Sequence, residues 1–157
     1  MSPQPPANQG VPATQGTPAR LARPRRGVVA VIHEAGRFLV IRRSQEVTAP
    51  GAICFPGGGV EAGETEEAAL VRELHEEVDA RDAIPRERLW TSVTPRGVQL
   101  AWWSAQLAAD TRLTPNPLEV AELFWWTAEE MQGSSDLLPS NREFLAWWHA
   151  MRRQTPG

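Results

Sequence analysis

The sequence predicts a single α/β domain in which a mixed β-sheet lies between helices, an α/β/α sandwich. Short apolar runs typical of strands occur on both sides of one amphipathic helical segment, and a second amphipathic segment closes the chain. The 157 residues, 41% of them hydrophobic, are enough for one core. A sheet covered by helices on both faces satisfies the burial demands of both kinds of element.

Residues 1–26 differ from the rest of the chain because they are rich in Pro and Gln and contain no aromatic residue. We expect them to form a disordered or polyproline-like tail that ends in several arginines. The tail has no apolar core of a secretory signal, and its prolines disfavour the amphipathic helix of a mitochondrial presequence. The folded domain is therefore predicted to span residues 27–153, with residues 154–157 as a second disordered end.

Three strands are predicted before the first helix. They span residues 27–33, 38–41 and 53–55. A turn at residues 34–37 joins the first two into a hairpin, which ends at Arg42 and Arg43. The third strand leads into Gly57-Gly58-Gly59, where the backbone can approach a phosphate or a metal without interference from a Cβ atom.

The first helix is predicted from about Thr65 to Val78, since no Gly or Pro interrupts this run. Thr65 suits the N-cap, and the two acids that follow it suit the positive end of the helix dipole. At 3.6 residues per turn the aliphatic residues fall on one side of the helix. They are Leu70, Val71, Leu74 and Val78.

Glu73, Glu76 and Glu77 share the neighbouring side of this helix. Like charges at this spacing cost a helix a few tenths of a kcal/mol, so a cation among them is favourable. Carboxylates together with substrate phosphate oxygens suit Mg²⁺ or Mn²⁺. The alternative is a solvated acidic face. The preceding glycines favour the metal site, as does Arg72, which can reach Glu76 one turn later.

The second half of the chain is predicted to supply three strands and two helices. The strands span residues 88–93, 98–107 and 119–126, and the first two form a hairpin around a turn at residues 94–97. Thr127 and Glu130 form a capping-box pattern for a short helix. Ser140 and Glu143 repeat the pattern and are predicted to open the terminal helix.

Two tryptophan pairs, Trp102-Trp103 and Trp125-Trp126, lie in predicted strands. Successive side chains of a strand point to opposite faces, so one member of each pair is expected in the core and its neighbour against a helix or a ligand pocket. Packing and base stacking are both open for these rings.

Composition excludes several classes of partner. The net charge of -3 does not indicate a nucleic-acid or membrane surface, and no apolar run approaches the roughly 18 residues of a membrane span. The single cysteine, Cys54, excludes an internal disulfide and agrees with a reducing compartment. We expect a cytoplasmic protein.

The glycine, acid and arginine positions match a known motif. Gly58, Glu64, Arg72-Glu73-Leu74 and Glu76-Glu77 resemble the Nudix box, which reads G, five residues, E, seven residues, R-E-aliphatic-x-E-E-x-G-aliphatic. The spacing matches throughout. Asp79 replaces the last glycine, which ends the helix with a positive φ, and Asp is a usual second choice there.

The resemblance implies a Nudix-type α/β/α sandwich that hydrolyses a nucleoside diphosphate linked to another group. It implies a Mg²⁺ or Mn²⁺ site at Glu73, Glu76 and Glu77, completed by a carbonyl of Gly57 or Gly58. A carboxylate after the box often joins this site, and Glu119 is the best match, with Glu122 second. Glu73 is the candidate general base, although some members carry that base on a loop outside the box. Arg72 is expected to act with these acids.

In MutT-type members an arginine at the corresponding strand end contacts substrate phosphate, which points to Arg43 first and Arg42 second. An asparagine before the last helix reads the nucleobase in such enzymes. Asn141 stands there, and a plain helix-capping role is its alternative. Gly59 stands where these enzymes can carry a lysine, so phosphate binding must be arranged differently here.

The predicted function is a MutT-like nucleoside triphosphate pyrophosphohydrolase that gives a nucleoside monophosphate and pyrophosphate. One alternative is an ADP-ribose or nucleotide-sugar pyrophosphatase, since such members carry a proline near the position of Pro95, which also suits a turn corner. The other is a nucleotide-binding module without catalysis. The expected partner is the nucleotide substrate, with no nucleic acid and no membrane, and a homodimer is left open.

Overall fold

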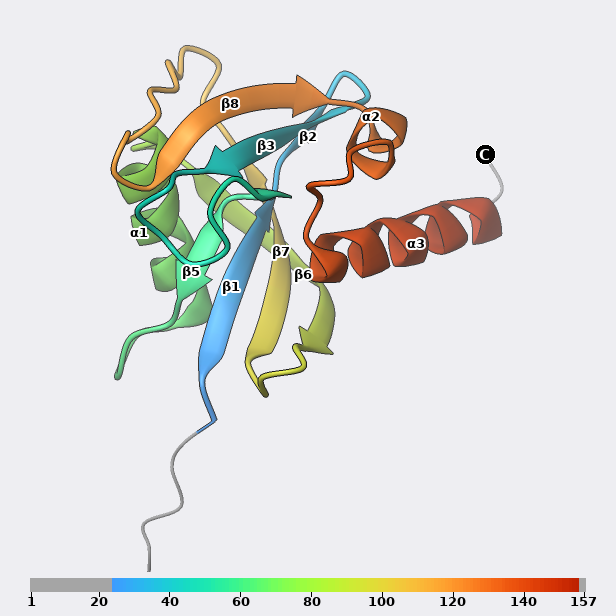
Figure 1. The fold of residues 1–157 in the computed structure, drawn as a ribbon, viewed down its shortest axis with the longest axis horizontal. Coiled ribbons are helices and arrows are strands. Elements are labelled where there is room, and N and C mark those ends of the chain that lie inside the picture. The colour runs from blue at the N-terminus through green and yellow to red at the C-terminus, as the bar shows by residue number, and fades with distance from the viewer. Residues whose placement is uncertain (1–23, 156–157) are drawn as a thin grey trace, which may run out of the picture.

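The structure is a computed structural model that describes residues 24–155. Most of the predicted tail and the last residues of the predicted C-terminal end lie outside the described residues. Within residues 24–155 the chain forms eight strands and three helices (Figure 1). The strands are β1 (Arg26–Val31), β2 (His33–Glu34), β3 (Arg37–Arg43), β4 (Ile53–Cys54), β5 (Gly57–Gly59), β6 (Ile84–Val93), β7 (Gln99–Gln106) and β8 (Val120–Trp126). The helices are α1 (Glu66–Val78), α2 (Ala128–Gln132) and α3 (Pro139–Gln154).

The strands form two four-stranded sheets. The first has the order β5-β1-β7-β6, and in it β1 runs parallel to β7 and antiparallel to β5. In the second, β3 lies between its antiparallel neighbours β4 and β8 and also pairs with β2. Ile32 connects β1 of the first sheet, which ends at Val31, with β2 of the second sheet, which begins at His33. The predicted mixed sheet is therefore present, but it is divided at this residue.

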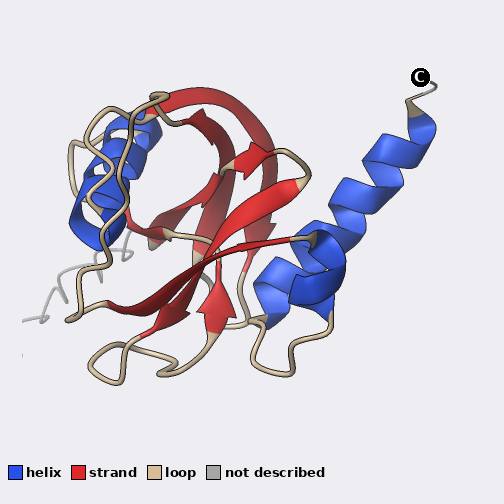
Figure 2. Cartoon of the chain, turned by 90° about the horizontal axis from the view of Figure 1, so that it is seen from above, coloured by secondary structure: helices blue, strands red, loops and turns tan. Residues whose placement is uncertain are grey.

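Helices lie on opposite sides of the strands, with α1 on one side and α2 and α3 on the other (Figure 2). Successive strand residues point to opposite faces of the sheet and pack in two separate hydrophobic cores. Val28 and Ala30 pack on the α1 side with Leu70 and Leu74, whereas Val29 packs on the α3 side. This arrangement confirms the α/β/α sandwich.

The tryptophan pairs follow the same alternation. Trp102 is fully buried on the α3 side, where its ring stacks on Phe144 with centroids 4.8 Å apart. Trp103 packs on the α1 side, and its indole nitrogen donates a hydrogen bond to Glu66 at 3.0 Å. Trp125 and Trp126 also belong to opposite cores. The rings therefore act in packing.

The local helix signals are largely confirmed. The Thr65 hydroxyl accepts from the Ala68 amide at 3.1 Å, and Asp79 ends α1 in the left-handed region with φ of 56°. Thr127 and Glu130 form the complete capping box of α2.

Three predicted details are wrong. Ser140 does not cap α3, because Leu138 is the N-cap without a side-chain bond and Pro139 already occupies the first turn. The strand β6 begins at Ile84 instead of Arg88; it is an edge strand of its sheet, where Pro85 is tolerated, and its pairing with β7 is irregular. The predicted first hairpin is short, because only β2 pairs with β3 while β1 joins the other sheet.

Candidate active site

Two glycines of β5 allow the strand to lie between β1 and α1. A Cβ atom at Gly57 would collide with the backbone carbonyl of Val28, and one at Gly58 would collide with the carboxylate of Glu73. The Gly57 amide points away from β1 and donates to Glu77 Oε1 at 3.1 Å. The glycine run therefore brings main-chain atoms directly against the acids of α1.

Three carboxylates meet beside this strand. One oxygen from each of Glu73, Glu77 and Glu119 lies within 4.8 Å of the others. Glu73 and Glu77 are one helical turn apart on α1, and Glu119 immediately precedes β8, which starts at Val120. Only 4% of the Glu77 surface is exposed.

Burial governs the protonation of these acids. It raises the pKa of Glu77 well above its ordinary value; the neighbouring charge of Glu73 raises this pKa further, and the hydrogen bond from Gly57 opposes the rise. Burial also raises the pKa of Glu73, against the effect of its hydrogen bond from Arg72. Three close carboxylates that are partly withdrawn from water form an oxygen-rich donor set that fits a divalent cation such as Mg²⁺ or Mn²⁺.

Arg72 connects the glycine strand to the acids. Its guanidinium donates two hydrogen bonds of 2.8 Å to the carboxylate of Glu64, and a third to Glu73 Oε1 at 2.9 Å. It also donates to the Gly59 carbonyl at 2.8 Å and to Glu76 at 3.3 Å. Its bonds lower the pKa of Glu64 to about 2. The fork of the guanidinium thus fixes the position of α1 relative to β5.

Glu76 does not join the cluster of three carboxylates. Its side chain is 47% exposed and its contact is with Arg72. The expected orientation of Glu76 by Arg72 is therefore present, but the bidentate partner of Arg72 is Glu64.

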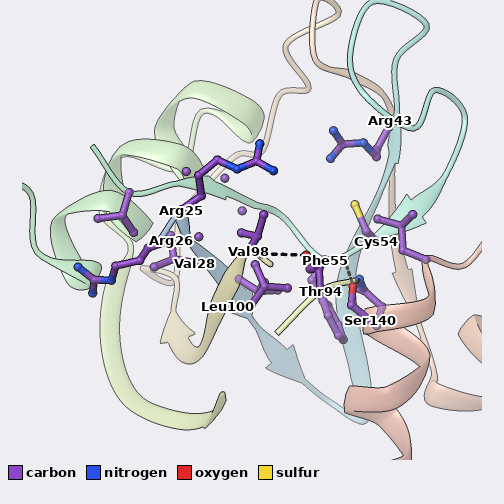
Figure 3. A pocket seen from close by; sticks show the side chains of 18 residues that line it. Arg25, Arg26, Val28, Arg43, Cys54, Phe55, Thr94, Val98, Leu100 and Ser140 are labelled. Carbon is purple, nitrogen blue, oxygen red and sulfur yellow. Dashed lines mark hydrogen bonds between the residues drawn. The ribbon is translucent and has the colours of Figure 1, made fainter. Parts of the chain in front are cut away.

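Two adjoining cavities lie at this end of the sheet. A small one of about 130 Å³ is lined by the three clustered carboxylates together with Arg43, Val47 and Gly57. A larger pocket of about 500 Å³ shares Arg43 and Gly57 with it (Figure 3). Apolar side chains such as Val98 and Leu100 and polar ones such as Asn141 also line the larger pocket. A ligand in the larger pocket can therefore extend to the carboxylates.

The sequence matches the model of the NUDIX domain over residues 22–148. The chain belongs to the Nudix family. Nudix enzymes hydrolyse phosphoric anhydride bonds in nucleotide-type substrates, and two of the three clustered carboxylates, Glu73 and Glu77, lie on the helix of the Nudix box.

Related proteins agree with this assignment. An uncharacterized Nudix hydrolase, orf19, of Rhodococcus erythropolis is 26% identical over 136 residues, which cover 76% of this chain and 74% of that protein. The solution structure of the ORF135 protein of E. coli matches with a TM-score of 0.67 and 28% identity, covering 85% of this chain and 94% of that one. The MutT protein of Methanosarcina mazei Go1 has the same fold, with a TM-score of 0.71, 23% identity, and coverage of 86% and 99%.

For the phosphate-binding arginine and for the additional metal ligand, the sequence predicted a first and a second choice, and the structure places the two choices differently. Arg43 lines both cavities and donates to the Thr48 carbonyl at 2.6 Å. Arg42 lines neither cavity, and it pairs with Asp136 at 3.1 Å and with Glu122 at 3.5 Å. Glu122 likewise lines neither cavity, so Arg42 and Glu122 pair with each other outside the two cavities.

Asn141 is 3% exposed, and its Oδ1 atom accepts from the Phe55 amide at 2.8 Å. It therefore does not cap α3, whose N-cap is Leu138, and instead joins the first turn of this helix to Phe55. Since an N–H donor needs an acceptor, this bond fixes the oxygen of the amide toward β4 and leaves Nδ2, which donates to Ser140 at 3.3 Å, as the group available to a ligand.

Arg25 is a pocket residue that the predicted domain boundary placed in the tail. It lines the larger pocket, and its carbonyl accepts from the Gln99 amide at 2.9 Å, which ties it to the sheet. Arg25 was missed at the level of the sequence because several other arginines of the predicted tail surround it. Its position two residues before Gly27, where the first strand was predicted to begin, could have indicated that it belongs to the sheet.

Pro95 lies in the turn between β6 and β7, which is closed by the bond from the Gly97 amide to the Thr94 carbonyl at 2.9 Å. Thr94 lines the larger pocket, but Pro95 does not.

Among residues 24–155, no helix has the length and apolar character needed to cross a membrane.

Proposed function

We propose that this Nudix hydrolase is a nucleoside triphosphate pyrophosphohydrolase that depends on Mg²⁺ or Mn²⁺ and gives a nucleoside monophosphate and pyrophosphate. The observation that carries the proposal is the shared wall of the two cavities. Arg43 and Gly57 border both the pocket of about 500 Å³, which suits a nucleoside, and the small acidic cavity. A nucleotide lying across this wall has its phosphates beside the three carboxylates.

Glu73, Glu77 and Glu119 are the residues that would hold the divalent cation. The Gly57 carbonyl is the better of the two glycine candidates, because the Gly57 amide already points to Glu77, and the carbonyl of an extended residue points to the same side as its amide. Gly58 is paired with Val28 of β1 instead. A bound divalent cation neutralises phosphate oxygens and lowers the pKa of water.

The side chains of the site have separate tasks in this proposal. Glu73 accepts the proton of the attacking water, and Arg72 holds Glu73 Oε1 in place by its bond of 2.9 Å. Arg43 binds a phosphate of the substrate through its guanidinium. The oxygen of water forms a new bond to phosphorus, the bridging P–O bond breaks, and pyrophosphate departs from the nucleoside monophosphate. Asn141 contacts the base with Nδ2 as donor.

A product assay over canonical and oxidised nucleoside triphosphates, ADP-ribose and dinucleoside polyphosphates, each with Mg²⁺ and with Mn²⁺, tests the proposal. We expect one triphosphate to yield monophosphate and pyrophosphate, and Glu77→Gln to lose this activity. Turnover of ADP-ribose or a dinucleoside polyphosphate alone would contradict the proposed substrate class, and full activity in Glu77→Gln would contradict the proposed site.

The role of Glu119 can be tested with a matched control. Glu119→Gln removes a charge from the cluster, whereas Glu122→Gln removes the same charge from the pair with Arg42 outside it. We expect Glu119→Gln to raise the Mg²⁺ concentration needed for half-maximal rate by about 10-fold or more. Glu122→Gln is expected to leave it unchanged. Equal effects of the two variants would remove Glu119 from the site.

A further inference from the structure

Arg25 immediately precedes β1 and Arg26 is the first residue of this strand, and their side chains project in opposite directions. Side chains of an extended segment alternate, so Arg25 shares a face with Val29, which packs on the α3 side, and both residues line the larger pocket. Arg26 also borders this pocket, but its guanidinium is engaged by an acid of α1, since its Nη2 atom donates to Glu66 at 3.1 Å. The two neighbouring cations therefore have different surroundings.

The charge of Arg25 is not balanced by a carboxylate. Among residues 24–155, neither Arg25 nor Arg43 forms an ion pair, whereas Arg26, Arg42 and Arg72 all do. Figure 3 shows the side chains of Arg25 and Arg43 extending toward one another from opposite rims of the pocket. Two cations that converge without an acid between them repel, and an anion between them removes this cost.

The space between the two arginines is bordered by Gly57, Gly58 and Gly59. Because these residues have no side chains, none obstructs a phosphate there. Gly59 also stands where MutT-type enzymes can carry a lysine, so a cation for the phosphates has to come from another residue. Arg43 lies beside the acidic cavity, which it also lines. Arg25 is contributed by the start of the sheet, whereas Asn141 is contributed by α3. A polyphosphate that starts at Arg43 therefore has a second cation farther along the glycine strand.

We propose that Arg25 binds a phosphate group of the substrate, so that Arg25 and Arg43 hold a nucleoside polyphosphate from opposite rims of the pocket. This inference rests on the proposed function and adds a specificity-determining residue to it. The planar guanidinium can bind phosphate oxygens in pairs, which a lysine does less well.

The variant Arg25→Gln tests the inference, with Arg88→Gln as its matched control. Arg88 is a cation of the same sheet, but it pairs with Glu66 at 3.3 Å and does not line the larger pocket. We expect Arg25→Gln to raise KM for the triphosphate about 10-fold with kcat within about threefold, and Arg25→Lys to recover part of the loss. A KM unchanged in Arg25→Gln, or raised equally in Arg88→Gln, would overturn the inference.

Phosphate contact can be separated from contact with the base or sugar. The nucleoside monophosphate product serves as a competitive inhibitor, and its inhibition constant should change less than about threefold in Arg25→Gln. An equal loss of affinity for monophosphate and triphosphate would place Arg25 at the nucleoside and contradict the proposal.

A binding experiment with inorganic tripolyphosphate and Mg²⁺ tests the role of Arg25 independently of which nucleotide the enzyme cleaves. We expect calorimetry to give about 10-fold weaker binding to Arg25→Gln than to the wild-type chain, whichever nucleotide is cleaved. If the wild-type enzyme cleaves only ADP-ribose but this difference is found, the proposed function fails while the phosphate contact of Arg25 stands. If the two bind tripolyphosphate equally, the role of Arg25 is refuted whatever the substrate.

Discussion

Alanine substitutions at Gly57, Gly58 and Gly59 should separate structural from catalytic effects within three consecutive residues. The same methyl group meets a different neighbour in each case. At Gly57 it collides with the main-chain carbonyl of Val28, which cannot move without shifting β1. At Gly58 it collides with the far end of the Glu73 side chain, and at Gly59 no atom lies within 4 Å.

The expected magnitudes follow from these neighbours. Overpacking against fixed structure costs about 1–3 kcal/mol, so Gly57→Ala should lower the free energy of unfolding by this amount. Gly58→Ala should lower it by less than about 1 kcal/mol, because a flexible carboxylate can move aside. That movement takes Glu73 out of place, and a displacement of about 1 Å at a catalytic group can cost about 100-fold in rate. Gly59→Ala should leave the free energy of unfolding nearly unchanged, because its methyl group meets no atom of the chain.

Urea unfolding followed by the fluorescence of the seven tryptophans measures the stability of the three variants, and steady-state kinetics measures kcat. The decisive result is Gly58→Ala with near-normal stability and a large loss of kcat. Normal kcat in Gly58→Ala would refute the role given to Glu73. A loss of stability at Gly59 as large as that at Gly57 would refute the geometric reasoning about the strand.

Three further predictions concern other residues. Asn141→Asp keeps an oxygen that accepts from the Phe55 amide but removes the Nδ2 donor. In urea denaturation it should be more stable than Asn141→Ala, and in steady-state kinetics it should raise KM for the preferred nucleotide. Burial and then the charge of Arg152 lower the pKa of His33, so the unfolded chain binds this proton more tightly; stability should fall as pH drops below about 6.5, and less so in His33→Gln. Burial raises the pKa of Cys54 to about 11, so its alkylation by iodoacetamide at pH 8 should be much slower than that of glutathione until urea unfolds the chain.

The elements set by local chemistry were predictable from the sequence. The cap at Thr65 and the left-handed end at Asp79 depend on residues within one helical turn, and both are present as expected. The start of α3 was not, because Pro139 begins the helix one residue before Ser140 and removes the need for its cap. The start of β6 was hidden for a related reason, since a strand pattern broken by Pro85 is tolerated only because β6 is an edge.

Choices between neighbouring residues required the structure. Arg42 and Arg43 are equivalent in composition, and strand alternation shows only that they differ in direction. Which of them faces the site depends on the pairing of β3 with β8, whose register shifts between these two arginines. The choice between Glu119 and Glu122 depends on the same pair of strands. A register shift of this kind has no signature within either strand.

The difference between features set by local sequence and features set by strand pairing also explains why the sequence indicates a reaction class more firmly than a substrate. The glycines, Arg72 and the acids of the box lie within residues 57–77, so a fixed spacing describes them, and of the three clustered carboxylates only Glu119 comes from elsewhere. The groups that would contact the rest of the substrate come from separate places: Arg25 immediately precedes β1, Arg43 ends β3 and Asn141 lies in α3. Each can change without altering the box, because the box defines none of their positions. Substrate choice within this fold is therefore expected to follow the residues of the larger pocket, while the chemistry of anhydride hydrolysis stays with the helix and the glycine strand.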